Sequence, residues 1–362
     1  MLVDSSRWTP KCATIGGDIA VRRQPVGRWS WTHAAMVATA ACLWGLSGTA
    51  AEWLMHADGV SPTWLTTVRM GVTGLVLLGV LRVRSGPRAW WGIWRRPSGL
   101  PRFLFFSLVG LTGVQFTYLA AIAASNAATA TLLQYLAPIL LVGMAALAAR
   151  HPITLWQGAL MVAAALGTWL LVSGGRGTSL VISPAGLAWG LLAAGTLALY
   201  TWTAPPLLRQ HGTVAVMAWS MLVGAAALSL VRPPTLGPTA WTWPVAGLVA
   251  TVALGGTLLA FGLFLASLSH IPPTTAAWLA AVEPVAAGVS AHAFLHVPLN
   301  TMQVAGGATV LAAAGLLAGA SVRGHGGARV GDPIMAAAYP AVPGEGDAYG
   351  NATHGPPAED AD

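Results

Sequence analysis

The chain has 362 residues, of which 55% are hydrophobic and only 8% are charged. A water-soluble domain carries about 25% charged residues, so this composition excludes a soluble globular protein and indicates a polypeptide that lies in a lipid bilayer. The formal net charge of +7 does not indicate nucleic acid binding, because the basic residues lie mostly in short segments between apolar runs.

The first long apolar segment, residues 34–55, follows a polar tail that contains Arg22, Arg23 and Arg28. It is longer than the hydrophobic region of a signal peptide, which has about 7–15 residues, and it therefore predicts a retained membrane span. Nine further segments follow, each close to the ~20 residues that a helix needs to cross a bilayer. The ten predicted spans are residues 34–55, 61–81, 103–123, 126–149, 153–173, 184–207, 212–231, 243–268, 273–296 and 300–321.

The basic residues predict how these spans are oriented. If both termini are cytoplasmic, only Arg176 and Arg232 of the 18 basic residues would lie on the outer side, and Arg69 would lie within a span. Such an excess on the inner side is what the positive-inside rule requires. We therefore expect a multi-pass protein of the cell (inner) membrane with both termini in the cytoplasm.

The segments outside the spans differ in composition from the rest of the chain. Residues 1–33 predict a cytoplasmic tail, and residues 322–362, rich in Gly, Pro, Ala and Asp, predict a disordered cytoplasmic tail. Residues 88–96, "RAWWGIWRR", combine tryptophan with arginine and predict a short helix on the inner membrane surface. A nucleic acid patch is the alternative interpretation of that segment.

Two halves of the chain match at a nearly constant offset. Trp44-Gly45 recurs as Trp189-Gly190, and Pro138 recurs as Pro284. Each half contains five spans, an odd number, so the second half must be inverted relative to the first. Inverted repeats are typical of secondary transporters, whose substrate site lies between the halves near the bilayer midplane. Three further matches are Gly110 with Gly256, Tyr118 with Phe264, and Gln157 with Gln303.

These residues resemble the EamA-type drug/metabolite transporter superfamily over residues 34–321. The resemblance implies an all-α membrane protein with ten transmembrane helices in two inverted five-helix repeats, residues 34–173 and 184–321. It also implies an inner-membrane carrier that exports small metabolites, such as amino acids, or drugs. The matching motifs are the two Trp-Gly pairs, Arg69 in "TTVRMGVTGLVLL", "SNAATATLLQYLAPIL" in span four, and Glu283-Pro284 in span nine.

Two positions depart from the family pattern. Family members usually have Gly-Glu just after spans four and nine, where this chain has Arg150-His151 and His296-Val297. This departure weakens the assignment to a subfamily more than the assignment of the fold.

Glu283 is the main candidate functional residue, because it lies about 15 Å from the inner end of its span, near the middle of the bilayer. A charge at that depth is costly, so Glu283 should face protein or a water-filled cavity. Pro284 and Pro138 predict helix kinks, and each leaves a backbone carbonyl free for water or ligand. Arg69 lies at a similar depth, and we expect it to approach Glu283. The pair can be structural, bind substrate or take part in proton coupling, and the sequence leaves these roles open.

Further polar and aromatic side chains on the spans complete the predicted central cavity. Glu52, near the outer end of span one, is either an extracellular gate residue or a solvated helix end. Polar groups on spans three and four would be unsatisfied in lipid, so we expect them to face inward. The predicted substrate-binding residues are Trp44, Arg69, Gln115, Tyr118, Gln134, Tyr135, Trp189, Trp278 and Glu283.

The sequence contains no pattern that indicates an enzyme, a metal or a cofactor. No His, Cys, Asp or Glu cluster has metal-ligand spacing, and "SGGRGTS", residues 173–179, lacks the lysine of a P-loop. The predicted function is secondary transport by alternating access, with a small molecule and the lipid bilayer as partners. The alternative is a non-transporting membrane subunit or an intramembrane enzyme. The oligomeric state, the substrate and the direction of transport stay open.

Overall fold

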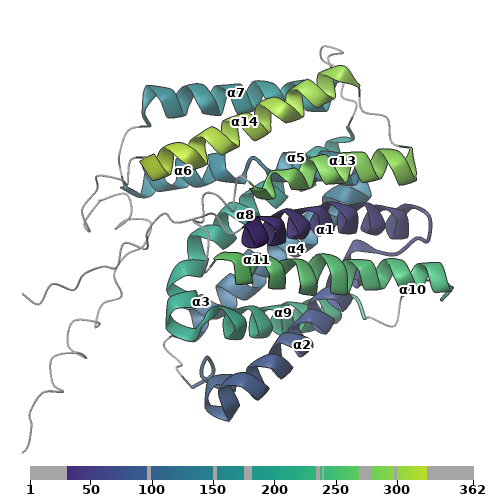
Figure 1. Ribbon diagram of the computed structural model, residues 1–362, viewed down its shortest axis with the longest axis vertical. Coiled ribbons are helices and arrows are strands. Elements are labelled where there is room, and N and C mark those ends of the chain that lie inside the picture. Colours follow the sequence, from purple (N-terminus) through teal and green to yellow (C-terminus); the bar gives the residue numbers. More distant parts are fainter. Residues whose placement is uncertain are drawn as a thin grey trace, which may run out of the picture.

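The protein is entirely helical wherever its structure is described, and no strand occurs in those ranges. The described helices of the two halves follow one another in a similar order (Figure 1), and the third span of each half contains a π-helical segment. The computed structural model describes residues 31–95, 99–149, 153–174, 182–233, 237–238, 240–268, 279–296 and 300–323.

The helices of the first half are α1 (Trp31–His56), α2 (Pro62–Trp90), α3 (Leu100–Phe105), η2 (Phe106–Leu111), α4 (Thr112–Ala124), α5 (Ala127–Gln134), α6 (Ala137–Ala149) and α7 (Leu155–Ser173). The helices of the second half are α8 (Pro184–His211), α9 (Thr213–Val231), α10 (Trp243–Ala250), η3 (Thr251–Leu259), α11 (Ala260–Leu268), α13 (Val282–Leu295) and α14 (Thr301–Arg323).

These helices correspond to the ten predicted spans. Within the described ranges, seven helical stretches are long and apolar enough to cross a membrane, and three shorter apolar helices, Leu155–Leu171, Val282–Leu295 and Thr301–Leu316, occupy the fifth, ninth and tenth positions. The first part of predicted span nine lies outside the described residues. The predicted surface helix over residues 88–96 is wrong, because α2 continues to Trp90 and residues 91–95 form turns.

The two halves exchange partners in a symmetric way. Helix α2 packs on α9, and α7 packs on α14, so each pairs with the helix at its own position in the other half. Two further sets of contacts match each other: α4 and α5 of the first half pack on α8, while α11 and α13 of the second half pack on α1. Figure 1 shows the α7–α14 pair at one end of the molecule and α2 with α9 at the other. The predicted fold class, with two inverted repeats of five spans, is confirmed.

The fifth span of each half begins with the same hydrogen-bonded cap. At the start of α7, Gln157 Oε1 accepts from Thr154 N at 3.0 Å, and Thr154 Oγ1 accepts from Gln157 N at 3.3 Å. At the start of α14, Gln303 Oε1 accepts from Asn300 N at 3.1 Å, and Asn300 Oδ1 accepts from Gln303 N at 2.8 Å. Reciprocal bonds of this type satisfy backbone N–H groups that have no partner within the helix. The match between Gln157 and Gln303 is thus a match between two helix starts.

The third span of each half carries a π-helical segment at the same place. At each π-helical segment a threonine hydroxyl donates to the carbonyl five residues earlier: Thr112, directly after η2, to Ser107 O at 2.7 Å, and Thr257, within η3, to Val252 O at 2.8 Å. Such segments are rare and occur frequently at functional sites. Their presence in both halves makes them part of the repeated scaffold.

The fourth and ninth spans are interrupted at equivalent points. Helix α5 ends at Gln134, residues 135–136 form a turn, and α6 begins at Ala137. In the second half a turn residue at position 281 precedes α13. A proline follows each interruption and cannot donate a backbone hydrogen bond. The structure therefore interrupts both spans just before Pro138 and Pro284.

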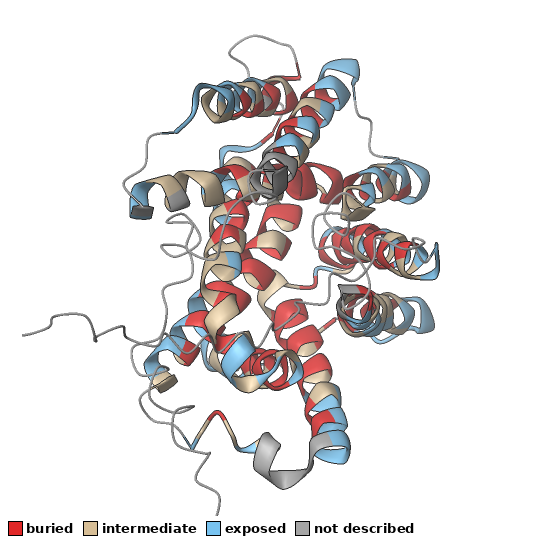
Figure 2. Ribbon diagram, turned by 60° about the vertical axis from the view of Figure 1, so that its left-hand side comes forward, coloured by how far each residue is buried: buried red, intermediate tan, exposed pale blue. Residues whose placement is uncertain are grey.

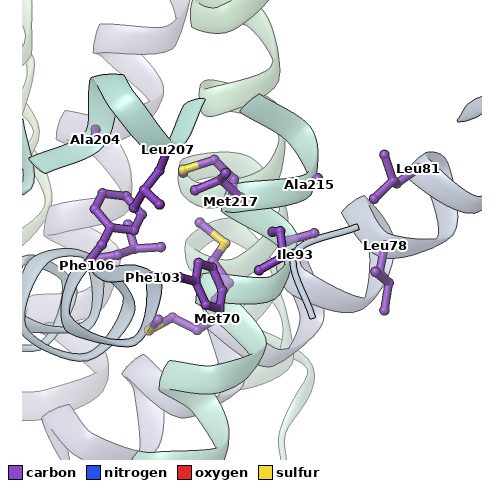
Figure 3. Close-up of a cluster of buried hydrophobic side chains, with 14 of the residues drawn as sticks. Met70, Leu78, Leu81, Ile93, Phe103, Phe106, Ala204, Leu207, Ala215 and Met217 are labelled. Atoms are coloured by element: carbon purple, nitrogen blue, oxygen red, sulfur yellow. The ribbon is translucent and has the colours of Figure 1, made fainter. Parts of the chain in front are cut away.

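Apolar packing fills the contact between α2, α9 and the third span. Met70, Phe103, Phe106 and Met217 are almost fully buried there, and Figure 3 shows their side chains meeting between the ribbons. The burial pattern in Figure 2 places buried residues on helix faces turned toward other helices. Large apolar side chains such as Leu147 are highly exposed, as expected for surfaces that meet lipid.

Candidate functional site

Arg69 and Gln115 form a buried polar pair between the second and third spans. Arg69 on α2 is 6% exposed, and Gln115 on α4 is 7% exposed. The Arg69 Nη2 donates to both the backbone oxygen and the Oε1 of Gln115, each at 2.7 Å. Arg69 Nε and Gln115 Nε2 are buried and have no hydrogen-bond partner. The pair therefore retains two unused donors.

Tyr118 lies one turn further along α4 and connects this pair with the rest of the cluster. Its hydroxyl shares a hydrogen bond of 2.9 Å with Thr131 Oγ1 on α5. Gly48 on α1 makes room for it, because a Cβ atom at Gly48 would lie 2.8 Å from the hydroxyl oxygen. Tyr118 also interacts electrostatically with Arg69 and with Glu283. It thus connects a residue of the first half with one of the second.

Tyr135 reaches across the two helix interruptions. Its hydroxyl donates to Ala280 O at 2.8 Å, from the turn of the fourth span to the ninth span. Because Pro284 has no N–H, the carbonyl four residues earlier, that of Ala280, lacks its usual helical partner. The expectation that this carbonyl is free for water or ligand is therefore wrong, since Tyr135 occupies it. Tyr135 also interacts with the Glu283 side chain.

Glu283 lies in the first turn of α13, where the helix dipole favours a negative charge. Helix α1 approaches this turn closely, because a Cβ atom at Gly45 would lie 2.6 Å from Ala287 N and 2.8 Å from Glu283 O. Thr49 and Ser290 continue the contact with a hydrogen bond of 2.6 Å between their hydroxyls. The close packing of α1 on α13 thus positions Glu283 beside the first half.

Arg69 and Glu283 belong to one polar cluster without contacting each other directly. The hydrogen bonds of Arg69 go to Gln115, and its electrostatic partner is Tyr118. Glu283 has Tyr135 as its side-chain partner. The expected approach of the two charges therefore occurs only through tyrosines, and no direct ion pair forms between them in the structure.

The two motif tryptophans occupy equivalent aromatic contacts between the halves. Trp44 on α1 packs edge-on against Phe261 on α11, with ring centroids 5.2 Å apart. Trp189 on α8 packs edge-on against Phe116 on α4, with centroids 5.6 Å apart. An offset of 145 residues relates Trp44 to Trp189 and also Phe116 to Phe261. Trp44 also lies 5.3 Å from the ring of Phe264.

Glu52 is not a solvated helix end, because it is only 4% exposed. Its Oε2 accepts a hydrogen bond of 2.8 Å from the backbone N–H of Ala127, the first residue of α5. A carboxylate suits this position, since helix N-termini have unsatisfied N–H groups and a partial positive charge. One turn later, His56 Nε2 lies 3.0 Å from Ala123 O. These contacts hold the end of α1 against the α4–α5 connection.

The structure does not bring every predicted site residue into this cluster. Gln134 is half-buried at the end of α5, and Trp278 lies outside the described residues. Sequence reasoning did not select Thr131, Phe116 or Phe261 for the site. The repeat offset of 145 residues was the available signal for the last two, because it relates Phe116 to Phe261 as it relates Trp44 to Trp189.

The cluster combines charged groups with hydrogen-bonding groups. It offers a guanidinium, an amide, two phenols and a carboxylate. Among the described residues, no group of three or more His, Cys, Asp or Glu side chains could hold a metal ion.

Comparisons with known proteins place both halves in one family. The model of the EamA-like transporter family matches residues 31–173 and again residues 184–319. The chain is 35% identical, over 257 residues, to the uncharacterized inner membrane transporter YicL of Salmonella typhimurium, and the match covers 70% of this chain and 84% of that protein. One solved crystal structure resembles it with a TM-score of 0.54 at 19% identity, covering 81% of this chain and 99% of the other, which shows likeness of fold.

Proposed function

Since the chain belongs to the EamA-like transporter family and is a multi-pass membrane transporter, we propose that it works without ATP and exports small metabolites, such as amino acids, or drugs by alternating access. One observation carries the proposal. Two interrupted helices, one from each half, meet at a polar cluster to which the buried Arg69 and the half-buried Tyr135 contribute from the first half and the half-buried Glu283 from the second.

The interrupted helices support a binding role for this cluster. Irregular backbone within a membrane is tolerated only where protein or a water-filled cavity surrounds it. In inverted-repeat transporters, the substrate site lies near the midplane where such helices meet. The predicted depths of Arg69 and Glu283 agree with that location. We therefore assign the central cavity to the cluster of Arg69, Gln115, Tyr118, Tyr135 and Glu283.

The packing of the halves supports alternating access. Because α2 pairs with α9 and α7 with α14, the halves meet through like helices at both ends of the molecule. A rotation of one half against the other would then open one side of the cluster as it closes the other. With both termini cytoplasmic, the contact of Glu52 with Ala127 lies on the outer side. We assign to it the role of holding the outer side closed.

A toxicity screen followed by flux measurement tests this function. Cells that produce the wild-type chain or Glu283→Gln are challenged with amino acids, nucleosides and cationic drugs. We expect the wild type alone to protect against at least one solute class, because Glu283→Gln removes the only carboxylate that the second half contributes to the cluster. Asp58→Asn is the matched control, since it makes the same change in the loop between α1 and α2.

Proteoliposomes that contain the purified chain then separate transport from binding. The protecting solute should cross the membrane without ATP, and tenfold or more slowly with Glu283→Gln than with Asp58→Asn. Uptake into the cells, where the proposal requires loss from them, would contradict the exporter assignment. A solute that binds without crossing would favour a non-transporting subunit.

A further inference from the structure

The Arg69 guanidinium is buried without a counter-ion. It is 6% exposed, and its hydrogen bonds go to two neutral oxygens of Gln115. Its electrostatic partner in the structure is a phenol, that of Tyr118. A buried charge is costly unless an opposite charge and hydrogen bonds compensate for it. The neighbouring residues provide part of the hydrogen bonding but no negative charge in contact.

Two buried nitrogens, one in this guanidinium and one in the adjacent amide, have no hydrogen-bond partner among the described residues. Arg69 Nε has no partner, and neither does Gln115 Nε2. The direction of the Gln115 amide is fixed by chemistry, because a guanidinium has donors only and therefore requires the Oε1 side. The NH₂ of Gln115 consequently points away from the Arg69 contact. Two touching side chains thus present the Nε–H of Arg69 and the NH₂ of Gln115 with no acceptor among the described residues.

We propose that Arg69 and Gln115 form a carboxylate-binding subsite and that the transported solute carries a carboxylate. The proposal rests on the assigned transport function and names the class of its substrate. A carboxylate has two oxygens, which can accept from the Arg69 and the Gln115 donors, and it supplies the missing negative charge. Its binding would complete a buried group that the apo protein leaves unsatisfied.

A single negative charge fits this site better than a neutral group or a polyanion. A neutral amide could accept the hydrogen bonds but would leave the guanidinium uncompensated. The guanidinium of Arg69 carries one positive charge, so a second negative charge of a polyanion would be buried without compensation. The subsite therefore selects solutes with one carboxylate at this end.

Thermal unfolding of the purified full chain in nanodiscs tests the subsite directly. The probe is phenylacetate, and its neutral comparison is phenylacetamide, which has nearly the same size. We expect phenylacetate, but not phenylacetamide, to raise the melting midpoint by a few degrees at millimolar concentrations, because a ligand of the native state stabilises it by mass action. Equal shifts with both compounds, no shift with either, or the same shift with sodium chloride would overturn the proposal.

Substitutions at Arg69 and Gln115 test whether the stabilisation by phenylacetate depends on these two residues. Arg69→Gln should abolish the shift with phenylacetate, and Gln115→Leu should weaken phenylacetate binding about tenfold. Asp58→Asn should retain it, because Asp58 lies in the loop between α1 and α2, outside the cluster. If Arg69→Gln binds phenylacetate as well as the wild type, the subsite is not at Arg69.

Gln115→Glu supplies a further test that does not depend on the stability of an Arg69 variant. A carboxylate at position 115 would lie in hydrogen-bond contact with Arg69 Nη2, where Oε1 now lies at 2.7 Å. We expect this variant to melt at a higher temperature than the wild type and to lose its response to phenylacetate. Gln115→Leu is the control, and it should respond more weakly to phenylacetate and show no rise in melting temperature. A Gln115→Glu protein that melts no higher than Gln115→Leu would contradict the need for an anion.

The flux assay separates this inference from the assigned function. Transport of a solute without a carboxylate, at a rate unaffected by Arg69→Gln, would refute the carboxylate subsite and leave the transport function standing. Binding of phenylacetate through Arg69 with no flux of any solute would support the carboxylate subsite and refute the transport function.

Discussion

The first and second halves carry the same helix caps, π-helical segments and Trp–Phe contacts but different polar side chains. Moving along the chain by 146 residues replaces Arg69 by Ala215, Tyr118 by Phe264 and Tyr135 by Ala281. In the opposite direction, Ala137 occupies the place of Glu283. Features that occur in both halves hold the helices and their interruptions in place. Features that occur in one half alone provide the charges and hydrogen bonds of the cluster.

This difference teaches which residues serve the scaffold and which serve recognition. An inverted repeat needs like surfaces where its halves exchange partners, and the caps and ring pairs meet that need on both sides. A solute has no such symmetry, so its binding groups need not be repeated. The substitutions below alter one half at a time and compare it with its counterpart.

The largest expected effect concerns the two motif glycines. A Cβ atom at Gly45 would meet backbone atoms of α13, whereas the three atoms nearest to a Cβ at Gly190 belong to the side chain of Leu133. Backbone cannot move without displacing its helix, but a rotamer change of Leu133 removes the contact with its Cδ1 and leaves the contact with its Cβ at 2.9 Å. We therefore expect Gly45→Ala to cost about 3 kcal/mol by overpacking and Gly190→Ala clearly less.

Melting midpoints of the two variants, measured side by side in detergent, check this prediction. Gly79→Ala is the control, because no atom lies within 4 Å of a Cβ at that position. Equal losses at Gly45 and Gly190 would mean that the two Trp-Gly motifs have the same packing role.

A smaller loss is expected at Glu52, whose counterpart in the second half is Leu197. Glu52→Leu introduces the residue that the second half has at this position, and it removes the acceptor of the Ala127 N–H. A hydrogen bond to a charged group contributes about 2 kcal/mol, so the melting midpoint should fall. Glu52→Gln keeps an acceptor oxygen and should recover most of the loss. A Glu52→Leu variant as stable as the wild type would show that the capping contact is dispensable.

The sequence alone was sufficient for the architecture. Apolar runs, the placement of arginine and the repeat offset predicted ten spans and two inverted repeats, because each is a property of segment length or order. Pro138 and Pro284 indicated kinks because proline lacks an N–H wherever it stands.

Partners across helices were not predictable in the same way. Whether Arg69 meets Glu283 or Gln115 depends on how α2 and α4 are rotated about their axes, and near-uniform alanine and leucine faces do not encode that rotation. The burial of Glu52 was missed for a related reason, since its partner is a backbone N–H that no sequence pattern identifies.

Tyr135→Phe removes the donor to the carbonyl that Pro284 leaves free. Ala281 stands in the place of Tyr135 in the second half, so its side chain cannot do the same for the carbonyl freed by Pro138. Hydrogen bonds between membrane helices contribute about 0.6 kcal/mol on average and at most about 1.7. We expect a loss of about 1 kcal/mol in stability and slower flux of the transported solute.

Tyr200→Phe is the matched control, because its hydroxyl contacts only the sulfur of Met217 at 3.7 Å. That variant should retain both stability and flux. If Tyr135→Phe transports as fast as Tyr200→Phe, the link between the two interruptions takes no part in the transport cycle.

The smallest effect distinguishes the two capping boxes. Thr154→Ala and Asn300→Ala each remove one cap, at a cost of about 1 kcal/mol. Asn300 Nδ2 also donates to Gly174 O at 3.1 Å, which ties the start of α14 to the end of α7. Asn300→Ala should therefore melt a degree or two below Thr154→Ala. Asn300→Asp separates the two functions, because an aspartate caps the helix but cannot donate to Gly174. It should fall between the wild type and Asn300→Ala, whereas a midpoint equal to that of Asn300→Ala would assign the whole difference to the bond between the halves.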